Sequence, residues 1–370
     1  MTSGNSNNNT SEDPGLYKTI KKDFKEGDIF TNIKRDFSEI KEFYISPEQK
    51  KRLDEMNSLK RFFFLLWWIL RSMILKLTPA RRIILLIGVI ACITINTSGN
   101  NNKNSNTSIE INLLGGSLIL LVLMLELKDK LLAKDELEAG RKVQESLMPE
   151  ESPLLAGWSL WLYTRPANEV CGDLVDYIKI NPERAGIVMA DVAGKGLNAA
   201  LLTAKLQATV RAYADDDDPV RIVSRVNNIF FRDSLRKIFA SLLYLQILPN
   251  SNKLIFVNAG HLPPVIVKSD GTTEMPKGET ALGLMKDMAY TLHQAELSSG
   301  EVFICYSDGV TETRNKEGSF FGSERFLKLL PSLISLTPND IGLKIISETD
   351  IFSRDTRPND DLSLIIIKRI

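Results

Sequence analysis

Four short segments of this sequence place an aspartate beside a glycine or a second acid at the end of an apolar stretch. They are Cys171-Gly172-Asp173, Asp191 to Gly196, Ser307-Asp308-Gly309 and Asn359-Asp360-Asp361. A strand end holds a carboxylate rigidly, and a neighbouring glycine lets the backbone approach a ligand closely. Aspartate oxygens completed by water are the ligands that Mg²⁺ and Mn²⁺ prefer in proteins. Taken together, these segments indicate chemistry with hard divalent cations.

The composition of the chain narrows the chemistry further. Only two histidines and three cysteines occur, so a histidine-rich zinc site, a thiolate zinc motif and a disulfide framework are all excluded. The 46 basic and 46 acidic residues cancel, which gives no net positive field to hold nucleic acid. We therefore expect no nucleic-acid partner.

The sequence lacks the motifs of several other classes of hydrolase. A P-loop needs Ser or Thr after its Gly-Lys pair, but Gly196 follows Lys195. The chain also lacks a Gly-x-Ser-x-Gly elbow and an Asp-x-Asp-x-Thr nucleophile motif. Each acidic segment taken alone has a simpler interpretation, since Asp308-Gly309 by itself is usually a turn. The combination favours a metal-activated water as the nucleophile.

Strand-like stretches that must position these acids dominate the chain after Gly157, and turn signals separate most of them. The expected strands cover 158–163, 176–180, 186–192, 239–248, 253–258, 264–268, 301–306 and 362–368. The expected helices cover 198–213, 219–237, 322–336 and 338–351. Strands that follow one another through turns indicate antiparallel sheets. The sequence therefore predicts an α+β domain, with sheets covered by helices.

Six motifs in a fixed order carry a family resemblance over about residues 140 to 370. They read CGDLVD, ADVAGKGLNAALLTA, VNAGHLPP, ALGL, YSDGVTETRN and NDDLSLIIIKR. This series resembles the SpoIIE/RsbU-type branch of the metal-dependent type 2C protein serine/threonine phosphatases. The resemblance implies an αββα sandwich, in which helices flank two antiparallel sheets. It also implies a centre of two Mg²⁺ or Mn²⁺ ions between the sheets.

The resemblance further assigns roles to individual residues. Asp191 matches the ligand that bridges the two ions. The implied metal ligands are Asp173, Asp191, Val192 through its backbone carbonyl, Asp308 and Asp360, and the implied neighbours of these ligands are Asp176 and Asp361. The implied reaction is attack on phosphorus by a hydroxide that bridges the ions, with Asp191 and Asp308 acting through this activated water.

Three residues near these motifs have open roles. Cys171 stands where most relatives have glycine, and its thiol suits either a redox switch or a small buried side chain, of which the second is favoured. The branch generally lacks the phosphate-binding arginine of eukaryotic relatives, so Lys195 or Arg165 could assist, but neither is assigned. His261 is expected to be a hydrogen-bonded structural histidine.

The N-terminal third has a different texture. Residues 1–60 predict a disordered and amphipathic arm, and residues 61–127 contain three apolar stretches. The stretch at about 62–76 resembles an interfacial segment, whereas those at about 82–97 and 109–127 predict a transmembrane hairpin. Flanking basic residues favour cytoplasmic arms on both sides. The alternative is a pair of buried helices in a soluble domain.

These predictions combine into one expected organisation. A linker helix covers 128–150, and a type 2C-like phosphatase domain covers 151–370. We expect a multi-pass protein of the cell membrane, in contact with lipid, with its catalytic domain in the cytoplasm and a homodimer formed through the linker helix. The resemblance implies a phosphorylated regulatory protein as substrate, namely an anti-sigma-factor antagonist of the STAS type. The alternative is a catalytically silent scaffold that binds the phosphoprotein.

Overall fold

The computed structural model describes residues 45–370 apart from 46, 55, 99–104, 183, 234–237, 250, 355 and 357. The chain divides into two compact units, Met1–Lys130 and Leu131–Ile370. Most of the predicted N-terminal arm of residues 1–60 lies outside the described residues.

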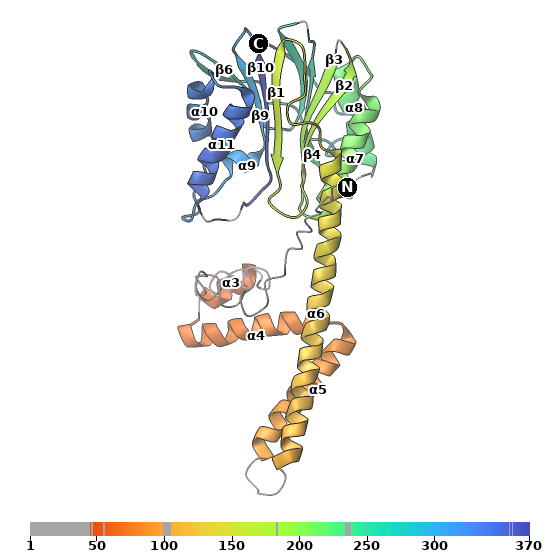
Figure 1. Ribbon diagram of the computed structural model, residues 1–370, viewed down its shortest axis with the longest axis vertical. Helices are drawn as coiled ribbons and strands as arrows, with labels where there is room; N and C mark the ends of the chain where they lie inside the picture. The colour runs from red at the N-terminus through yellow and green to blue at the C-terminus, as the bar shows by residue number, and fades with distance from the viewer. Residues whose placement is uncertain are drawn as a thin grey trace, which may run out of the picture. The chain divides into compact units, whose positions relative to one another are not determined.

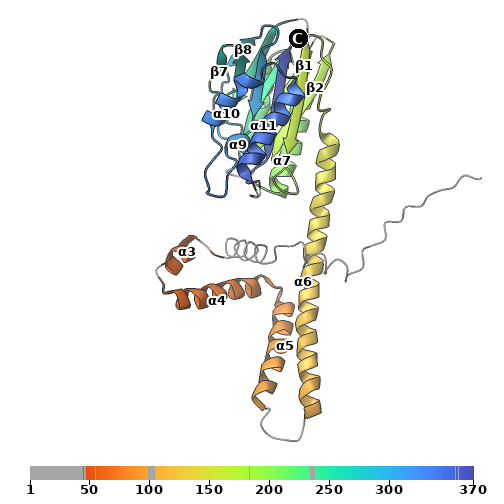
Figure 2. The ribbon, with the colours of Figure 1, turned by 60° about the vertical axis from the view of Figure 1, so that its left-hand side comes forward.

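The first unit is helical where it is described. Its helices are α3 (Pro47–Asp54), α4 (Ser58–Lys76), α5 (Pro79–Ser98) and the first part of α6 (Ser105–Leu147). Arg81, near the start of α5, forms ion pairs of 2.7 Å with both Glu126 and Asp129 on α6. A Cβ on Gly88 of α5 would lie 3.0 Å from the carbonyl oxygen of Gly115 on α6. Helices α5 and α6 therefore pack as a close antiparallel pair (Figure 2).

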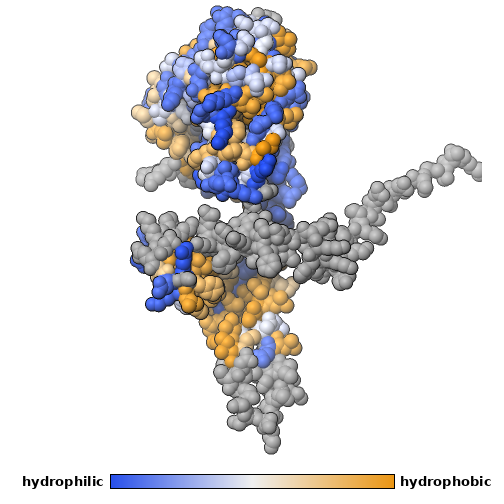
Figure 3. All heavy atoms as spheres, turned by 90° about the vertical axis from the view of Figure 1, so that its left-hand side faces the viewer, coloured by the Kyte–Doolittle hydropathy of each residue, from blue (hydrophilic) through white to orange (hydrophobic). Residues whose placement is uncertain are grey.

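Many large apolar side chains of this unit are exposed, including Phe63 and Trp67 on α4 and Leu123 on α6. Figure 3 shows apolar side chains gathered on the helices of the unit. Even so, none of the helices in the described parts of the chain is long and apolar enough to span a bilayer. The prediction of a transmembrane hairpin, and with it of a multi-pass location in the cell membrane, is therefore wrong.

Charged residues account for this result. Arg71 lies within the apolar stretch of α4, Arg81 is the third residue of α5, and Glu126 and Asp129 end the apolar stretch of α6. A membrane span requires about 20 predominantly apolar residues in succession. A single helix, α6, covers both the predicted second span and most of the predicted linker.

The second unit contains two five-stranded antiparallel sheets (Figure 1). The first sheet has the order β1 (Trp158–Arg165), β10 (Leu362–Arg369), β9 (Val302–Tyr306), β6 (Val265–Lys268) and β7 (Gly271–Glu274). The second has the order β2 (Asp173–Asn181), β3 (Arg184–Val192), β4 (Ala240–Ile247), β5 (Lys253–Ala259) and β8 (Leu292–Glu296). The predicted sandwich of antiparallel sheets is confirmed. The sequence analysis missed β7 and β8, which are short edge strands with mostly polar residues.

Helices cover the outer face of each sheet (Figures 1 and 2). Helices α7 (Leu197–Tyr213) and α8 (Pro219–Asp233) pack on the second sheet. The first sheet is covered by α9 (Asp308–Thr311), α10 (Ser323–Leu329), the 3₁₀ helix η1 (Leu330–Leu333) and α11 (Pro338–Ser353). The predicted helix at 322–336 changes to a 3₁₀ turn because Pro331 cannot donate a backbone hydrogen bond.

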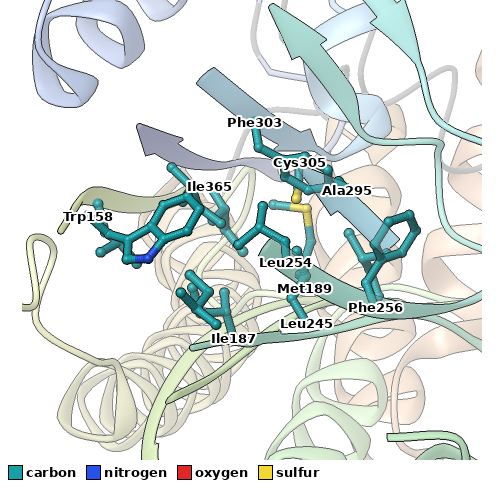
Figure 4. Packing of buried hydrophobic residues seen from close by; sticks show 14 of the residues in the cluster. Trp158, Ile187, Met189, Leu245, Leu254, Phe256, Ala295, Phe303, Cys305 and Ile365 are labelled. Carbon is teal, nitrogen blue, oxygen red and sulfur yellow. The ribbon is translucent and has the colours of Figure 1, made fainter. Parts of the chain in front are cut away.

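The space between the sheets is filled by apolar side chains from both of them, among them Met189, Phe256, Phe303 and Ile365 (Figure 4). Alternate residues of the same strands pack outward, as Val188 does against α7 and α8. The strand pleat therefore determines which side chains face the opposite sheet.

Candidate active site

Two of the predicted ligands lie on adjacent strands of the second sheet. Asp173 begins β2 and stands directly opposite Asp191 of β3. Val175 follows Asp173 by two positions and Met189 precedes Asp191 by two, and both pack between the sheets. Residues two apart share a face of a strand, so the pleat directs both carboxylates toward the first sheet.

The remaining acids come from neighbouring strands of the first sheet. Asp308 follows β9 and opens α9, whereas Asp360 and Asp361 precede β10. β9 and β10 pair in antiparallel register, which brings these two strand ends together. Only glycine is accommodated at position 309, because a Cβ there would collide with the Asp361 carbonyl. The acidic segments of both sheets thus meet at one end of the sandwich.

The carboxylates at this end repel one another. Burial, followed by the charges of Asp308 and Asp360, raises the pKa of Asp191 to about 6. Burial and the charge of Asp191 raise the pKa of Asp173 well above its ordinary value. Burial and the charge of Asp360 also raise the pKa of Asp308. These raised pKa values identify a cluster of anions whose ionised forms a divalent cation would stabilise.

Asp361 fixes the loop that leads into β2. Its carboxylate accepts hydrogen bonds from the backbone N–H of Ala167 at 2.7 Å and from that of Gly172 at 2.6 Å. The N–H of Asp173 lies 3.5 Å from the same carboxylate. Asp361 therefore holds the backbone on which Asp173 is placed, and it does so across the two sheets.

Two serines that the sequence analysis did not single out complete this link. Ser363 Oγ donates to Asp173 Oδ2 at 2.6 Å, and the Ser363 backbone N–H donates to Ser307 Oγ at 2.9 Å. Ser307 Oγ in turn donates to the Asp361 carbonyl at 3.1 Å. Both serines are fully buried. The available sequence signal was a single polar residue at the end of each apolar strand.

Asp176 has a different environment from the one predicted. It lies three positions after Asp173 on β2, so the pleat places it on the opposite face of the sheet. There it forms two 2.7 Å hydrogen bonds with Arg211 of α7. Arg211 also donates to the carbonyl of Leu147 at the end of α6. Asp176 is therefore linked through Arg211 to the end of α6, on the face of the sheet that α7 covers.

The donor set matches a hard divalent cation. Asp191, Asp308 and Asp360 offer carboxylate oxygens, and the Val192 carbonyl oxygen lies beside Gly172. In the described ranges, however, no three acidic, histidine or cysteine side chains converge as a ready-made metal site.

Cys171 is buried beside these acids, with its Sγ 3.7 Å from Thr164 Oγ1. Burial, followed by the charges of Asp361 and Asp173, raises the pKa of its thiol. The thiolate needed for redox chemistry is thereby disfavoured, which supports the structural role over the redox switch. Gln144 of α6 accepts from the Cys171 N–H at 3.0 Å and donates to its carbonyl at 2.9 Å.

A hollow of about 460 Å³ adjoins Asp191 and Asp308, and His261 and Lys277 contribute to its lining. His261 Nδ1 lies 2.8 Å from Ser241 Oγ. Burial lowers the pKa of His261 to about 4, so the imidazole is neutral near neutral pH. These contacts agree with the structural role expected for His261. The hollow therefore lies directly beside two acids of the cluster.

Comparison with known proteins agrees with this geometry. Residues 181–370 match the family described as Stage II sporulation protein E (SpoIIE). This range contains Asp191, Asp308, Asp360 and Asp361, whereas Asp173 precedes it.

Two curated relatives extend the similarity. The chain is 28% identical over 270 residues to Protein IcfG of Synechocystis, an alignment that covers 64% of this chain and 42% of that protein. It is 24% identical over 239 residues to Phosphoserine phosphatase RsbU of Bacillus subtilis, covering 64% of this chain and 70% of RsbU. The chain therefore spans less than half the length of IcfG.

A solved structure shows the same fold. The SiaA-PP2C domain of Pseudomonas aeruginosa superimposes with a TM-score of 0.57 at 18% sequence identity. The match covers 65% of this chain and 98% of that domain. The arrangement of two antiparallel sheets flanked by helices is thus a PP2C-like fold.

Proposed function

Because the chain belongs to the SpoIIE family, we propose that it is a metal-dependent protein serine/threonine phosphatase. The observation that carries this proposal is the meeting of Asp173 and Asp191 from one sheet with Asp308 and Asp360 from the other. The relative named Phosphoserine phosphatase RsbU supports the same activity.

We assign two Mg²⁺ or Mn²⁺ ions to the acidic cluster. The proposed ligands are Asp173, Asp191, the Val192 carbonyl, Asp308 and Asp360. When bound, such ions neutralise phosphoryl oxygens and lower the pKa of the attacking water. The protein contributes rigid placement: Ser363 orients the Asp173 carboxylate, and Asp361 holds the backbone before it. The hollow beside Asp191 and Asp308 receives the phosphorylated side chain.

The proposed substrate is a phosphoserine or phosphothreonine on a regulatory protein of the STAS type. The resemblance found in the sequence motifs suggests this partner, and the name of RsbU supports phosphoserine as the group removed. The hollow also fits a protein-borne phosphate, because it opens to the surface beside the acidic cluster.

A homodimer through the last part of α6 is a further part of the proposal. Leu131, Leu132 and Val143 are each at least half exposed on this helix. A second copy of the helix could bury them. Light scattering of the full-length chain and of a variant with Leu131 and Val143 replaced by glutamate would test this interface.

The activity test uses the purified full-length chain with p-nitrophenyl phosphate and with phosphoserine peptides. We expect hydrolysis with Mn²⁺ or Mg²⁺ and none with a chelator. Asp308→Asn should lower the rate by at least about a hundredfold, since a lost ligand costs several kcal/mol of charge stabilisation. Phosphoprotein binding without hydrolysis would instead support the silent scaffold.

A further inference from the structure

Lys195 occupies the loop between β3 and α7, directly beside the acidic cluster. Its Nζ donates to the Asn359 carbonyl at 2.7 Å and lies 3.1 Å from Asp360 Oδ2. The side chain remains 61% exposed. Gly194 and Gly196 on either side have φ values of 119° and 73°, and a Cβ on either would meet nothing within 4 Å. The two glycines therefore give the loop its positive φ values at positions that are not crowded by other atoms, and Lys195 lies between them.

The charge of Lys195 interacts with other acids of the cluster besides Asp360. It attracts the carboxylates of both Asp191 and Asp308, and this attraction partly offsets the repulsion among the acids. Lys195 thus supplies positive charge to the cluster in the absence of metal. Divalent cations bound by the same carboxylates would remove that attraction and replace it with repulsion between like charges.

Arg165 and Lys277 are less suited than Lys195 to bind a phosphoryl group at the cluster. Arg165 donates two hydrogen bonds, of 2.8 and 3.1 Å, to the carboxylate of Asp350. Lys277 lines the hollow beside Asp191 and Asp308, but none of the hydrogen bonds or ion pairs of the described chain joins it to a carboxylate of the cluster. Lys195, by contrast, combines contact with a proposed ligand, exposure and a long flexible stem.

We propose that Lys195 binds the phosphoryl group of the substrate and that it leaves Asp360 for this group when divalent cations bind. The inference rests on the proposed phosphatase function and names a residue for it. A lysine ammonium is a compact charge that pairs with phosphate oxygens without a fixed geometry. Its contact with Asp360 holds it close to the phosphate position until the cations bind.

This exchange predicts effects of opposite sign in one variant. In Lys195→Met, Mg²⁺ should bind about threefold more tightly, because a competing positive charge is gone. Inorganic phosphate should bind the Mg²⁺-loaded variant about tenfold more weakly, because a charge-assisted hydrogen bond is lost. Lys195→Arg should retain most of the phosphate affinity. Titration calorimetry of the full-length chain measures both constants without turnover.

The matched control is Lys205→Met on α7, because Lys205 forms a similar 2.9 Å ion pair with Asp233 away from the cluster. This variant should leave both constants unchanged. Unchanged phosphate affinity in Lys195→Met would overturn the proposal, and so would a loss confined to Lys277→Met. Weaker binding of both Mg²⁺ and phosphate in Lys195→Met would also overturn it, since that result indicates a structural role for the loop. Absence of metal-dependent hydrolysis in the wild type would count against the proposed function. The calorimetric test of Lys195 does not depend on that activity.

Discussion

Replacing Asp191 by asparagine should stabilise the metal-free protein while removing its activity. In the folded chain, burial and the charges of Asp308 and Asp360 raise the pKa of Asp191 from 3.8 to about 6. The folded state therefore retains the proton over this interval while the unfolded state releases it. Stability must then fall as the pH rises from 3.8 to about 6, and above that interval the full cost of the ionised group is present.

The size of the effect follows from the shift. About two pKa units correspond to roughly 3 kcal/mol at neutral pH, as an upper limit for a group that solvent partly screens. In a unit of this size, that difference raises the melting temperature by about 6 to 12 °C. Asp191→Asn removes the charge and keeps the shape, so the variant should gain most of this stability near neutral pH. Near pH 4 the wild type and the variant should have the same melting temperature, since Asp191 is then protonated in the folded state.

Calorimetric melting of the full-length chain in chelator measures this difference across the pH range. Saturating Mg²⁺ should reverse the order, because the wild type gains ligand binding that the variant has lost. Asp270→Asn, in the exposed turn between β6 and β7, is the control and should change nothing. A variant that melts at or below the wild-type temperature in chelator near neutral pH would refute the reasoning that burial and the neighbouring acids destabilise ionised Asp191.

Three further predictions concern the surroundings of the cluster. Gln144→Ala removes both hydrogen bonds to the Cys171 backbone and should weaken Mg²⁺ binding by about fivefold in calorimetry; equal affinity in this variant and in Lys142→Ala, exposed on the same helix, would contradict that role. Arg211→Met leaves the buried Asp176 charge unpaired and should cost about 3 kcal/mol or more in urea unfolding, and adding Asp176→Asn should recover part of that loss. The Cys171 thiol, buried and with a raised pKa, should resist iodoacetamide in the native state and react only after unfolding; rapid native labelling seen by mass spectrometry would disprove this.

Local sequence patterns were sufficient to predict most of the strands and helices of the second unit. Short apolar stretches bounded by turn signals predicted most strands, because strands that pack against the opposite sheet on one face and against helices on the other are apolar on both faces. Asp191 at the end of one apolar stretch and Asp308 two residues after another predicted acids at strand ends. Proline and glycine marked several turns correctly. Short edge strands such as β7 escaped because their residues are mostly polar and leave no apolar pattern.

The N-terminal helices show a limit of the same reasoning. Apolar stretches predicted helices at the right places, and α5 and α6 do form a pair. Whether such a helix crosses a membrane depends on an unbroken apolar length, which charged residues such as Glu126 reduce. Hydrophobicity alone was therefore a poor guide to location.

What the sequence alone determined was the identity of the acids and the strands that carry them. Only the tertiary structure decided which of them meet: antiparallel pairing placed Asp173 opposite Asp191, and the pleat turned Asp176 away toward Arg211. The structure also gave Asp361 its role in holding the loop before β2, and it placed Lys195 against Asp360. The physical reason is that these contacts join residues far apart in the chain. Their formation depends on strand register and on the packing of two sheets, and neither is encoded in any local stretch of residues.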